Sequence, residues 1–197
     1  MSPPWIAVSG IDGAGKTTLL DWLRRDLLPG ATVHKKTDRN DAARVARHHP
    51  VFPLRGRADV AYGWGTLFDY LAHARRVEHD PGDGAVLLDR WSLCVAAWCG
   101  QVLGVGPAAD DLLQTMRRPD LTLFLECRPA IARARLEGRG TPKPDEDLGI
   151  LEAFAAGYEA VLARPGVGPL VRIVEGDEES VRQAAAKALA DHGLVAR

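Results

Sequence analysis

Short runs rich in apolar residues recur along this chain, separated by longer stretches with a different pattern. The runs are at residues 5–9, 31–36, 85–88, 121–126 and 170–174. A short apolar run without polar alternation is typical of a strand inside a parallel sheet, because both faces of such a strand are covered. We therefore predict five strands, of which the second is the weakest because it is partly polar.

The stretches between the strands carry helical periodicity. In the longest of them, Leu67, Tyr70, Leu71 and Ala74 share one face. Strands that alternate with helices predict a doubly wound parallel sheet with ligands bound at the carboxyl edge of its strands. The predicted helices are 16–28, 41–48, 58–79, 92–103, 107–118, 129–137, 148–162 and 180–190.

The loop after the first strand carries a glycine motif. Residues 10–17 fit the pattern G-x-x-x-x-G-K-[ST], and they lie between a predicted strand and a predicted helix, as a P-loop requires. Glycine allows the backbone to approach a polyphosphate closely, and the start of the helix adds positive potential. The expected nucleotide-binding residues are Gly10, Gly13, Ala14, Gly15, Lys16, Thr17 and Thr18.

Two side chains of the P-loop have an expected chemical role. Lys16 would reach the β- and γ-phosphates of ATP, and the hydroxyl of Thr17 would ligate Mg²⁺. The alternative is a chance glycine turn before a helix. The flanking strand and helix favour phosphate binding.

The third predicted strand is followed directly by Asp89 and Arg90. P-loop proteins place an acid at the end of such a strand, where it holds Mg²⁺, usually through water. An arginine at the same edge can bind an acceptor phosphate through two parallel hydrogen bonds. An Asp–Arg surface pair is the alternative, and the P-loop at the same edge favours the functional interpretation.

A polar segment with proline and glycine, residues 138–147, is predicted to form a mobile lid. Ala14 precedes the last glycine of the P-loop, so the loop supplies no arginine of its own. Phosphoryl transfer spreads negative charge over the moving group, and a closing lid can bring the missing cation. Arg135 and Arg139 are the candidates, whereas Arg133 is more typical of a solvated helix face. Lys143 is a further cation of the lid.

Composition narrows the class of protein. A chain of 197 residues fits a single domain spanning 1–197, and a net charge of −1 argues against a general nucleic-acid or membrane-surface binder. Cys94, Cys99 and Cys127 show neither a disulfide framework nor metal-ligand spacing. No signal segment or membrane span is evident. We expect a cytoplasmic protein.

Together these motifs resemble the thymidylate kinase family of nucleoside-monophosphate kinases, in order and over most of the chain. The resemblance implies a P-loop kinase fold and Mg²⁺-dependent transfer of phosphate from ATP to dTMP or a related (deoxy)nucleoside monophosphate. It also makes a homodimer through the third helix possible. It rests on residues 10–18, on Asp89-Arg90-Trp91, on residues 119–125 and 133–140, and on the stretch from Phe154 to Tyr158.

The resemblance also implies roles for single residues. Asp12 matches an acid near the acceptor sugar and the metal, and Trp98 stands where the family has a tyrosine under the deoxyribose. The pair Asp89 and Arg90 would organise Mg²⁺ and the acceptor phosphate. The expected catalytic residues are Lys16, Asp12, Arg90, Arg135 and Arg139. The expected acceptor-binding residues are Asp12, Arg39, Phe68, Arg75, Arg90 and Trp98.

The chain departs from the family mainly on the acceptor side. The family's Arg-Glu-Pro after the second strand is replaced by residues 37–40, in which Arg39 is a shifted substitute. The arginine expected in the third helix has no clean match, and Arg75 is one of several candidates. Cys94 and Val95 stand where polar residues touch thymine, and neither is a good hydrogen-bonding group. These departures indicate a kinase scaffold with a rebuilt acceptor site.

Two other functions remain open. An ATP-dependent kinase of a nucleoside or another small-molecule hydroxyl would need a carboxylate base, for which Asp12, Asp38 and Asp89 are candidates. A nucleotide-binding switch that is not a kinase is less favoured, because no glutamine or switch pattern follows the P-loop. Acceptor-dependent consumption of ATP distinguishes a kinase from a switch.

Overall fold

The computed structural model describes residues 3–35, 57–106, 108–140, 146–164 and 167–195. Its centre is a five-stranded sheet in the order β2-β3-β1-β4-β5, in which every neighbouring pair is parallel. This confirms the predicted α/β architecture. The strands are β1 (Trp5–Ser9), β2 (Thr32–Lys35), β3 (Val86–Asp89), β4 (Leu121–Glu126) and β5 (Leu170–Val174).

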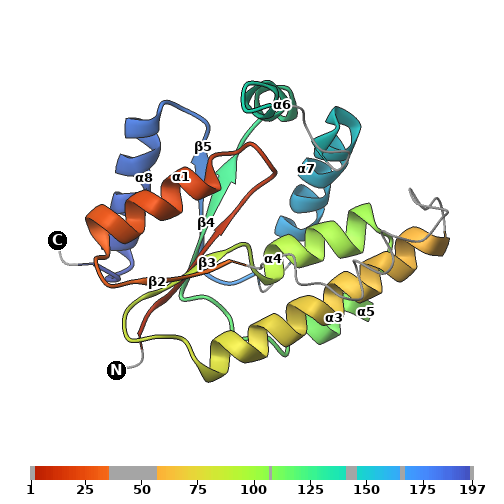
Figure 1. The fold of residues 1–197 in the computed structure, drawn as a ribbon, viewed down its shortest axis with the longest axis horizontal. Coiled ribbons are helices and arrows are strands. Elements are labelled where there is room, and N and C mark those ends of the chain that lie inside the picture. Colours follow the sequence, from red (N-terminus) through yellow and green to blue (C-terminus); the bar gives the residue numbers. More distant parts are fainter. Residues whose placement is uncertain (1–2, 36–56, 107, 141–145, 165–166, 196–197) are drawn as a thin grey trace.

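Helices cover both faces of the sheet (Figure 1). Helices α1 and α8 lie side by side on one face, and α3, α4 and α5 lie across the other. The helices are α1 (Lys16–Trp22), continued by the π-helical turn η1 (Leu23–Leu27), α3 (Arg57–His79), α4 (Ser92–Val95), continued by η2 (Ala96–Val102), α5 (Ala108–Leu113), α6 (Pro129–Glu137), α7 (Leu148–Leu162) and α8 (Glu178–Asp191).

Two helix ends differ from the prediction. Helix α5 ends at Leu113 instead of residue 118, because the hydroxyl of Thr115 and the backbone N–H of Met116 bond the carbonyls of the preceding turn. Helix α8 begins two residues early, because the carboxylate of Asp177 accepts a hydrogen bond from the backbone N–H of Ser180 and caps it. The predicted helix at 41–48 lies outside the described residues.

The register of the sheet brings the motif residues to one edge. Val8 of β1 pairs with Asp89 of β3, and Ser9 pairs with Phe124 of β4. The P-loop, Asp89 and Arg90 therefore leave the sheet at the same carboxyl edge, as a parallel sheet requires.

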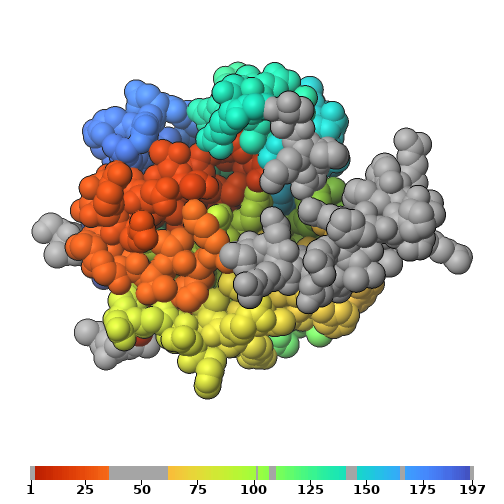
Figure 2. Space-filling model, viewed as in Figure 1, coloured from red at the N-terminus to blue at the C-terminus, as the bar shows by residue number. Residues whose placement is uncertain are grey.

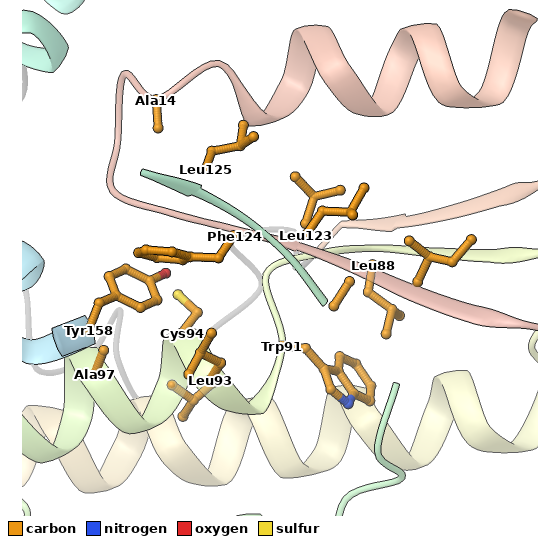
Figure 3. Packing of buried hydrophobic residues seen from close by; sticks show 14 of the residues in the cluster. Ala14, Leu88, Trp91, Leu93, Cys94, Ala97, Leu123, Phe124, Leu125 and Tyr158 are labelled. Carbon is orange, nitrogen blue, oxygen red and sulfur yellow. The ribbon is translucent and has the colours of Figure 1, made fainter. Parts of the chain in front are cut away.

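The core is built on the central strands. Every residue of β1 is buried, and Trp5 contacts Trp91 edge to face with ring centroids 5.8 Å apart. Figure 3 shows β4 residues packed between the P-loop above and α4 below. The space-filling view shows the amino-terminal segment bordered by α8 and α6 (Figure 2). No helix in the described part of the chain is long and apolar enough to cross a membrane.

Candidate active site at the P-loop

The P-loop packs directly against α6, and one glycine makes this possible. Gly13 has φ of 80°, and a Cβ atom built there would lie 2.4 Å from the carbonyl oxygen of Ala132 in α6. A side chain at Gly13 would therefore collide with backbone that cannot move aside. This close approach sets α6, and with it Arg135, beside the phosphate-binding loop.

Lys16 is folded back onto its own loop. Its Nζ donates a hydrogen bond of 2.7 Å to the carbonyl of Ile11 and lies 3.8 Å from a carboxylate oxygen of Asp12. The side chain is 7% exposed, and burial lowers the pKa of Lys16 to about 8, with the positive charge of Arg90 acting in the same direction. A polyphosphate would add negative charge beside this buried ammonium.

Arg90 adopts a backbone conformation that few side chains take. Its φ is 68°, and it is the single non-glycine residue with positive φ in the described part of the chain. Such strain persists where the surrounding structure holds it, and it is concentrated at functional sites. The turn directs the guanidinium of Arg90 toward the P-loop instead of along the strand.

The guanidinium of Arg90 has contacts on both of its edges. Nη2 forms an ion pair with Asp12, and Nη1 lies 3.4 Å from the carbonyl of Gly10 and 3.2 Å from Sγ of Cys94. The ring of Phe154 lies below it, 5.6 Å from the guanidinium carbon. Burial by itself lowers the pKa of Arg90, but Cys94 and Asp12 raise that pKa well above its usual value. The side chain is therefore a permanent cation beside Lys16.

Tyr158 of α7 also contacts the P-loop, although the chemistry of the motifs gave it no role. Its hydroxyl accepts a 3.2 Å hydrogen bond from the N–H of Gly10 and donates a 3.3 Å hydrogen bond to the carbonyl of Gly10. Burial, and to a lesser extent Cys94, raises the pKa of Tyr158 well above its usual value, so the hydroxyl keeps its proton. The ring is fixed by Phe154 and Phe124, at centroid distances of 4.8 and 4.9 Å.

Replacing Tyr158 by phenylalanine tests the two hydrogen bonds between its hydroxyl and the backbone of Gly10. Tyr158→Phe leaves the N–H of Gly10 buried without its partner, so we expect the free energy of unfolding to fall by about 1–2 kcal/mol. We also expect the affinity for ATP to fall several-fold, because Gly10 opens the phosphate-binding loop. Urea unfolding and calorimetric titration with ATP measure the two effects. Tyr62→Phe, which removes a hydroxyl from α3, is the control. An equal loss of ATP affinity in both variants would contradict a role of the Tyr158 hydroxyl in holding Gly10.

Residues suited to a hydrated magnesium ion lie at the same edge. Oδ1 of Asp89 is buried without a hydrogen-bond partner, and Thr17 is exposed at the start of α1. Among the described residues, no group of three or more His, Cys, Asp or Glu side chains could hold a metal ion. Magnesium is commonly bound by one or two protein oxygens together with phosphates and water. The pair Asp89 and Thr17 fits that kind of site.

The cations predicted for the lid divide into two kinds. Nη1 of Arg135 lies 3.5 Å from the carbonyl of Gly13, so this arginine reaches the P-loop. Arg133 instead bonds Glu137 at 2.7 Å and the carbonyl of Glu146 at 2.9 Å, so it joins the two described ends of the lid segment. Lys143 lies outside the described residues.

A cavity of about 180 Å³ opens beside the P-loop. It lies between the start of α1, the end of α6 and the start of α8, and both lid arginines line it together with Arg182. Its other lining residues are Ala14, Gly15, Thr18, Leu19, Gly176, Glu178 and Val181. A second cavity of about 430 Å³ borders Thr122 at the beginning of β4, and its lining includes no P-loop residue.

Arg75 lies far from the P-loop along α3. It bonds Glu78 at 2.7 Å, and Glu78 accepts a 2.8 Å hydrogen bond from the backbone of Arg117. The guanidinium of Arg117 lies over Trp5, the first residue of β1. These contacts place Arg75 toward the amino edge of the sheet, opposite the P-loop.

The predicted aromatic contacts of the acceptor lie in different surroundings. Trp98 packs on Phe154 with ring centroids 5.1 Å apart, and Phe154 in turn contacts Arg90. Phe68 is 56% exposed and packs only loosely against Trp64, at 6.0 Å. Arg39 lies outside the described residues.

Helix α3 brings a different side chain toward Arg90. Tyr70 is buried. This burial is the main reason that the pKa of Tyr70 lies well above its usual value; Cys94 also raises that pKa, whereas Arg90 lowers it. Tyr70 therefore belongs to the surroundings of Arg90. The apolar helix face contained this tyrosine, but periodicity alone could not separate it from ordinary core residues.

The two positions that stand for thymine-contacting residues are both in the core. Val95 is 0% exposed and Cys94 is 3% exposed. The thiol of Cys94 faces Arg90. Neither side chain is open to a ligand in this arrangement.

The fold and this site together define an α/β P-loop kinase. No protein-family model matches the chain. It is 27% identical over 167 residues to a protein named "Probable thymidylate kinase" from Pyrobaculum aerophilum, covering 82% of this chain and 84% of the relative. Two proteins named thymidylate kinase are each 29% identical. The thymidylate kinase of Halorhodospira halophila matches 69% of this chain over 68% of its own length. The thymidylate kinase of Hahella chejuensis matches 94% of this chain over 95% of its own length.

These three relatives agree with the resemblance of the chain to the thymidylate kinase family. They also indicate that the protein is an ATP-dependent kinase. Both conclusions agree with the expectations from the motifs.

Proposed function

We propose that this protein transfers the γ-phosphoryl group of ATP, with Mg²⁺, to the phosphate of a nucleoside monophosphate, with dTMP or a related deoxynucleotide as the leading acceptor. The observation that carries the proposal is the placement of Arg90 beside Lys16 at the P-loop. One cation would hold the donor phosphates and the other the acceptor phosphate. Such an arrangement brings two polyanions into line for transfer.

The surroundings of the P-loop support ATP as the donor. The phosphates would bind the loop and Lys16, and the base and ribose would extend into the cavity lined by Thr18 and Arg139. Arg135, beside the carbonyl of Gly13, would stabilise charge on the moving phosphoryl group. Thymidylate kinases use ATP in this role, which agrees with the relatives described above.

Magnesium would be held by the hydroxyl of Thr17 and, through water, by Asp89. When bound, the ion neutralises the β- and γ-phosphate oxygens. The unpartnered Oδ1 of Asp89 supports this proposal, because a buried carboxylate oxygen without a partner is costly unless a ligand supplies one.

A phosphate acceptor needs no side-chain base, because its oxygen is already a nucleophile at neutral pH. The contacts of Asp12 also favour this reaction over transfer to a hydroxyl. Asp12 pairs with Arg90 and lies near Lys16, so its carboxylate is engaged by two cations, as suits an orienting group. The hydroxyl-acceptor kinase remains the second candidate, with the unpartnered Oδ1 of Asp89 as its base.

The test is consumption of ATP in the presence of Mg²⁺ with one acceptor at a time. The panel contains dTMP, the other nucleoside monophosphates, the matching nucleosides, and a sample without acceptor. We expect turnover with dTMP or another monophosphate and little with nucleosides. Turnover with nucleosides alone would replace the proposal by the hydroxyl-acceptor reaction, and equal turnover without any acceptor would indicate a hydrolase.

A further inference from the structure

Arg90 is held by protein contacts on the edge of its guanidinium that faces away from Asp12. Nη1 reaches both the carbonyl of Gly10 and the sulfur of Cys94, at 3.4 and 3.2 Å. The hydroxyl of Tyr158 donates to the same carbonyl at 3.3 Å. Figure 3 shows the sulfur of Cys94 beside the hydroxyl of Tyr158, under Phe124. Two segments therefore contact this edge of the guanidinium directly, and Tyr158 holds the carbonyl that one of them offers.

The other edge is the one free to exchange partners. Nη2 pairs with Asp12, whose side chain is 40% exposed, so this contact lies on the open side of the site. A phosphate that approaches the P-loop can replace the carboxylate at Nη2 without disturbing Nη1. Asp12 would then keep its position near Lys16, 3.8 Å away.

We propose that Cys94 and Tyr158 are positioning residues for Arg90, which hold its Nη1 edge so that its Nη2 edge faces the acceptor phosphate. The role in acceptor binding rests on the function proposed above. Cys94 takes part through its thiol, and its contribution to acceptor selectivity comes through Arg90 and not through contact with a base.

The local geometry explains how Cys94 can position the guanidinium of Arg90. The positive φ of Arg90 turns the chain back under the sheet, and α4 then begins at Ser92. Cys94 lies four residues after Arg90 and is buried beneath its side chain. The sulfur at this place accepts from the guanidinium, and the residue adds no second carboxylate to compete with the acceptor phosphate for Arg90.

The experiment compares Cys94→Ala with Cys94→Ser and with Cys99→Ala. Cys99 is as fully buried on η2, so its replacement controls for the loss of a buried thiol. Steady-state kinetics with dTMP and ATP give kcat and KM, calorimetry gives the Kd of ATP, and thermal unfolding gives Tm. We expect kcat/KM for dTMP to fall about tenfold in Cys94→Ala, since a hydrogen bond to a charged group is lost. The Kd of ATP should change less than twofold.

The serine variant distinguishes a positioning role of Cys94 from a role in core packing alone. Cys94→Ser restores an acceptor for Nη1, so its kcat/KM for dTMP should return to within about threefold of the wild-type value. An equal loss of kcat/KM in Cys94→Ala and Cys99→Ala would overturn the proposal. So would a Cys94→Ser variant no better than Cys94→Ala, or a loss of ATP affinity that matches the loss for dTMP.

A second measurement does not depend on turnover. The guanidinium N–H signals of Arg90 in NMR spectra, assigned by their absence from Arg90→Lys, should be protected from exchange in the wild type and in Cys94→Ser. They should lose that protection in Cys94→Ala. Protected signals in a protein that turns over none of the nucleoside monophosphates would reject the proposed function and leave the positioning intact. Equal protection in the wild type and Cys94→Ala would overturn the positioning whatever the substrate.

Discussion

Lys16→Met should remove kinase activity and make the folded protein more stable. The ammonium is buried and would bind the donor phosphates directly, so its loss should lower kcat/KM for ATP by about 10²–10³-fold or more. The same burial is unfavourable without ATP, as the pKa of about 8 shows. Methionine keeps the apolar stem and removes the charge.

The gain in stability has a definite pH dependence. Burial lowers the pKa of Lys16 from 10.5 in the unfolded chain to about 8 in the folded protein. Below pH 8 both states carry the proton, and the folded state bears the full cost of the buried charge. At about 1.4 kcal/mol per pKa unit this cost is roughly 3 kcal/mol. Between pH 8 and 10.5 the folded state loses the proton first, so wild-type stability rises relative to Lys16→Met and the difference disappears.

Urea unfolding of both proteins at pH 7 and pH 10 measures this difference. Lys187→Met, which removes an exposed lysine from α8, is the matched control and should change the free energy of unfolding by less than about 0.5 kcal/mol. A Lys16→Met protein less stable than the wild type at pH 7 would show that the hydrogen bond to Ile11 outweighs the cost of burying the charge. Retention of ATP turnover would contradict the role of Lys16 itself.

Arg90→Lys should impair use of the acceptor while leaving ATP binding nearly intact. Lysine keeps the charge but cannot reach Asp12, Gly10 and Cys94 together, and it lacks the planar fork that binds a phosphate through two hydrogen bonds. Loss of such contacts predicts a fall in kcat/KM for the acceptor of about 10²-fold. The Kd of ATP should stay within about threefold.

The matched control is Arg172→Lys. Arg172 also pairs with a carboxylate, that of Glu159, and lies over an aromatic ring, that of Phe124, but it is on β5 and exposed. Arg172→Lys should leave kcat/KM for the acceptor almost unchanged. Kinetics with the best acceptor of the panel and ATP titration measure both variants. Equal weakening of ATP and acceptor in Arg90→Lys would show that Arg90 supports the P-loop in general and does not bind the acceptor.

Most of the fold could be predicted from local patterns in the sequence. The predicted runs matched all five strands. The inner strands β1, β3 and β4 are short and largely apolar because both of their faces are covered, whereas the edge strands β2 and β5 include polar residues. Helices α6 and α7 agree with their predicted bounds, since proline at the first turn of one and Asp147 before the other mark their starts. The P-loop was recognised for a similar reason. Its glycine spacing is itself the requirement of phosphate binding.

Other properties of the site depend on residues far apart in the chain. Tyr158 lies 148 positions after Gly10, and Arg90 lies 78 positions after Asp12. Nothing in the local pattern of either segment indicates its partner. The strained φ of Arg90 and the lowered pKa of Lys16 likewise arise from packing around them. Sequence patterns report backbone preference and amphipathicity, which are local.

The sequence by itself therefore determined the doubly wound sheet and the phosphate-binding loop. Only the tertiary structure decided how the candidate acceptor-binding residues are arranged, with Arg90 between Asp12 and Cys94 and with Arg75 toward the opposite edge. The physical reason is that hydrogen bonds, burial and charge act between whichever groups the fold brings together. Those energies do not exist until the sheet has formed.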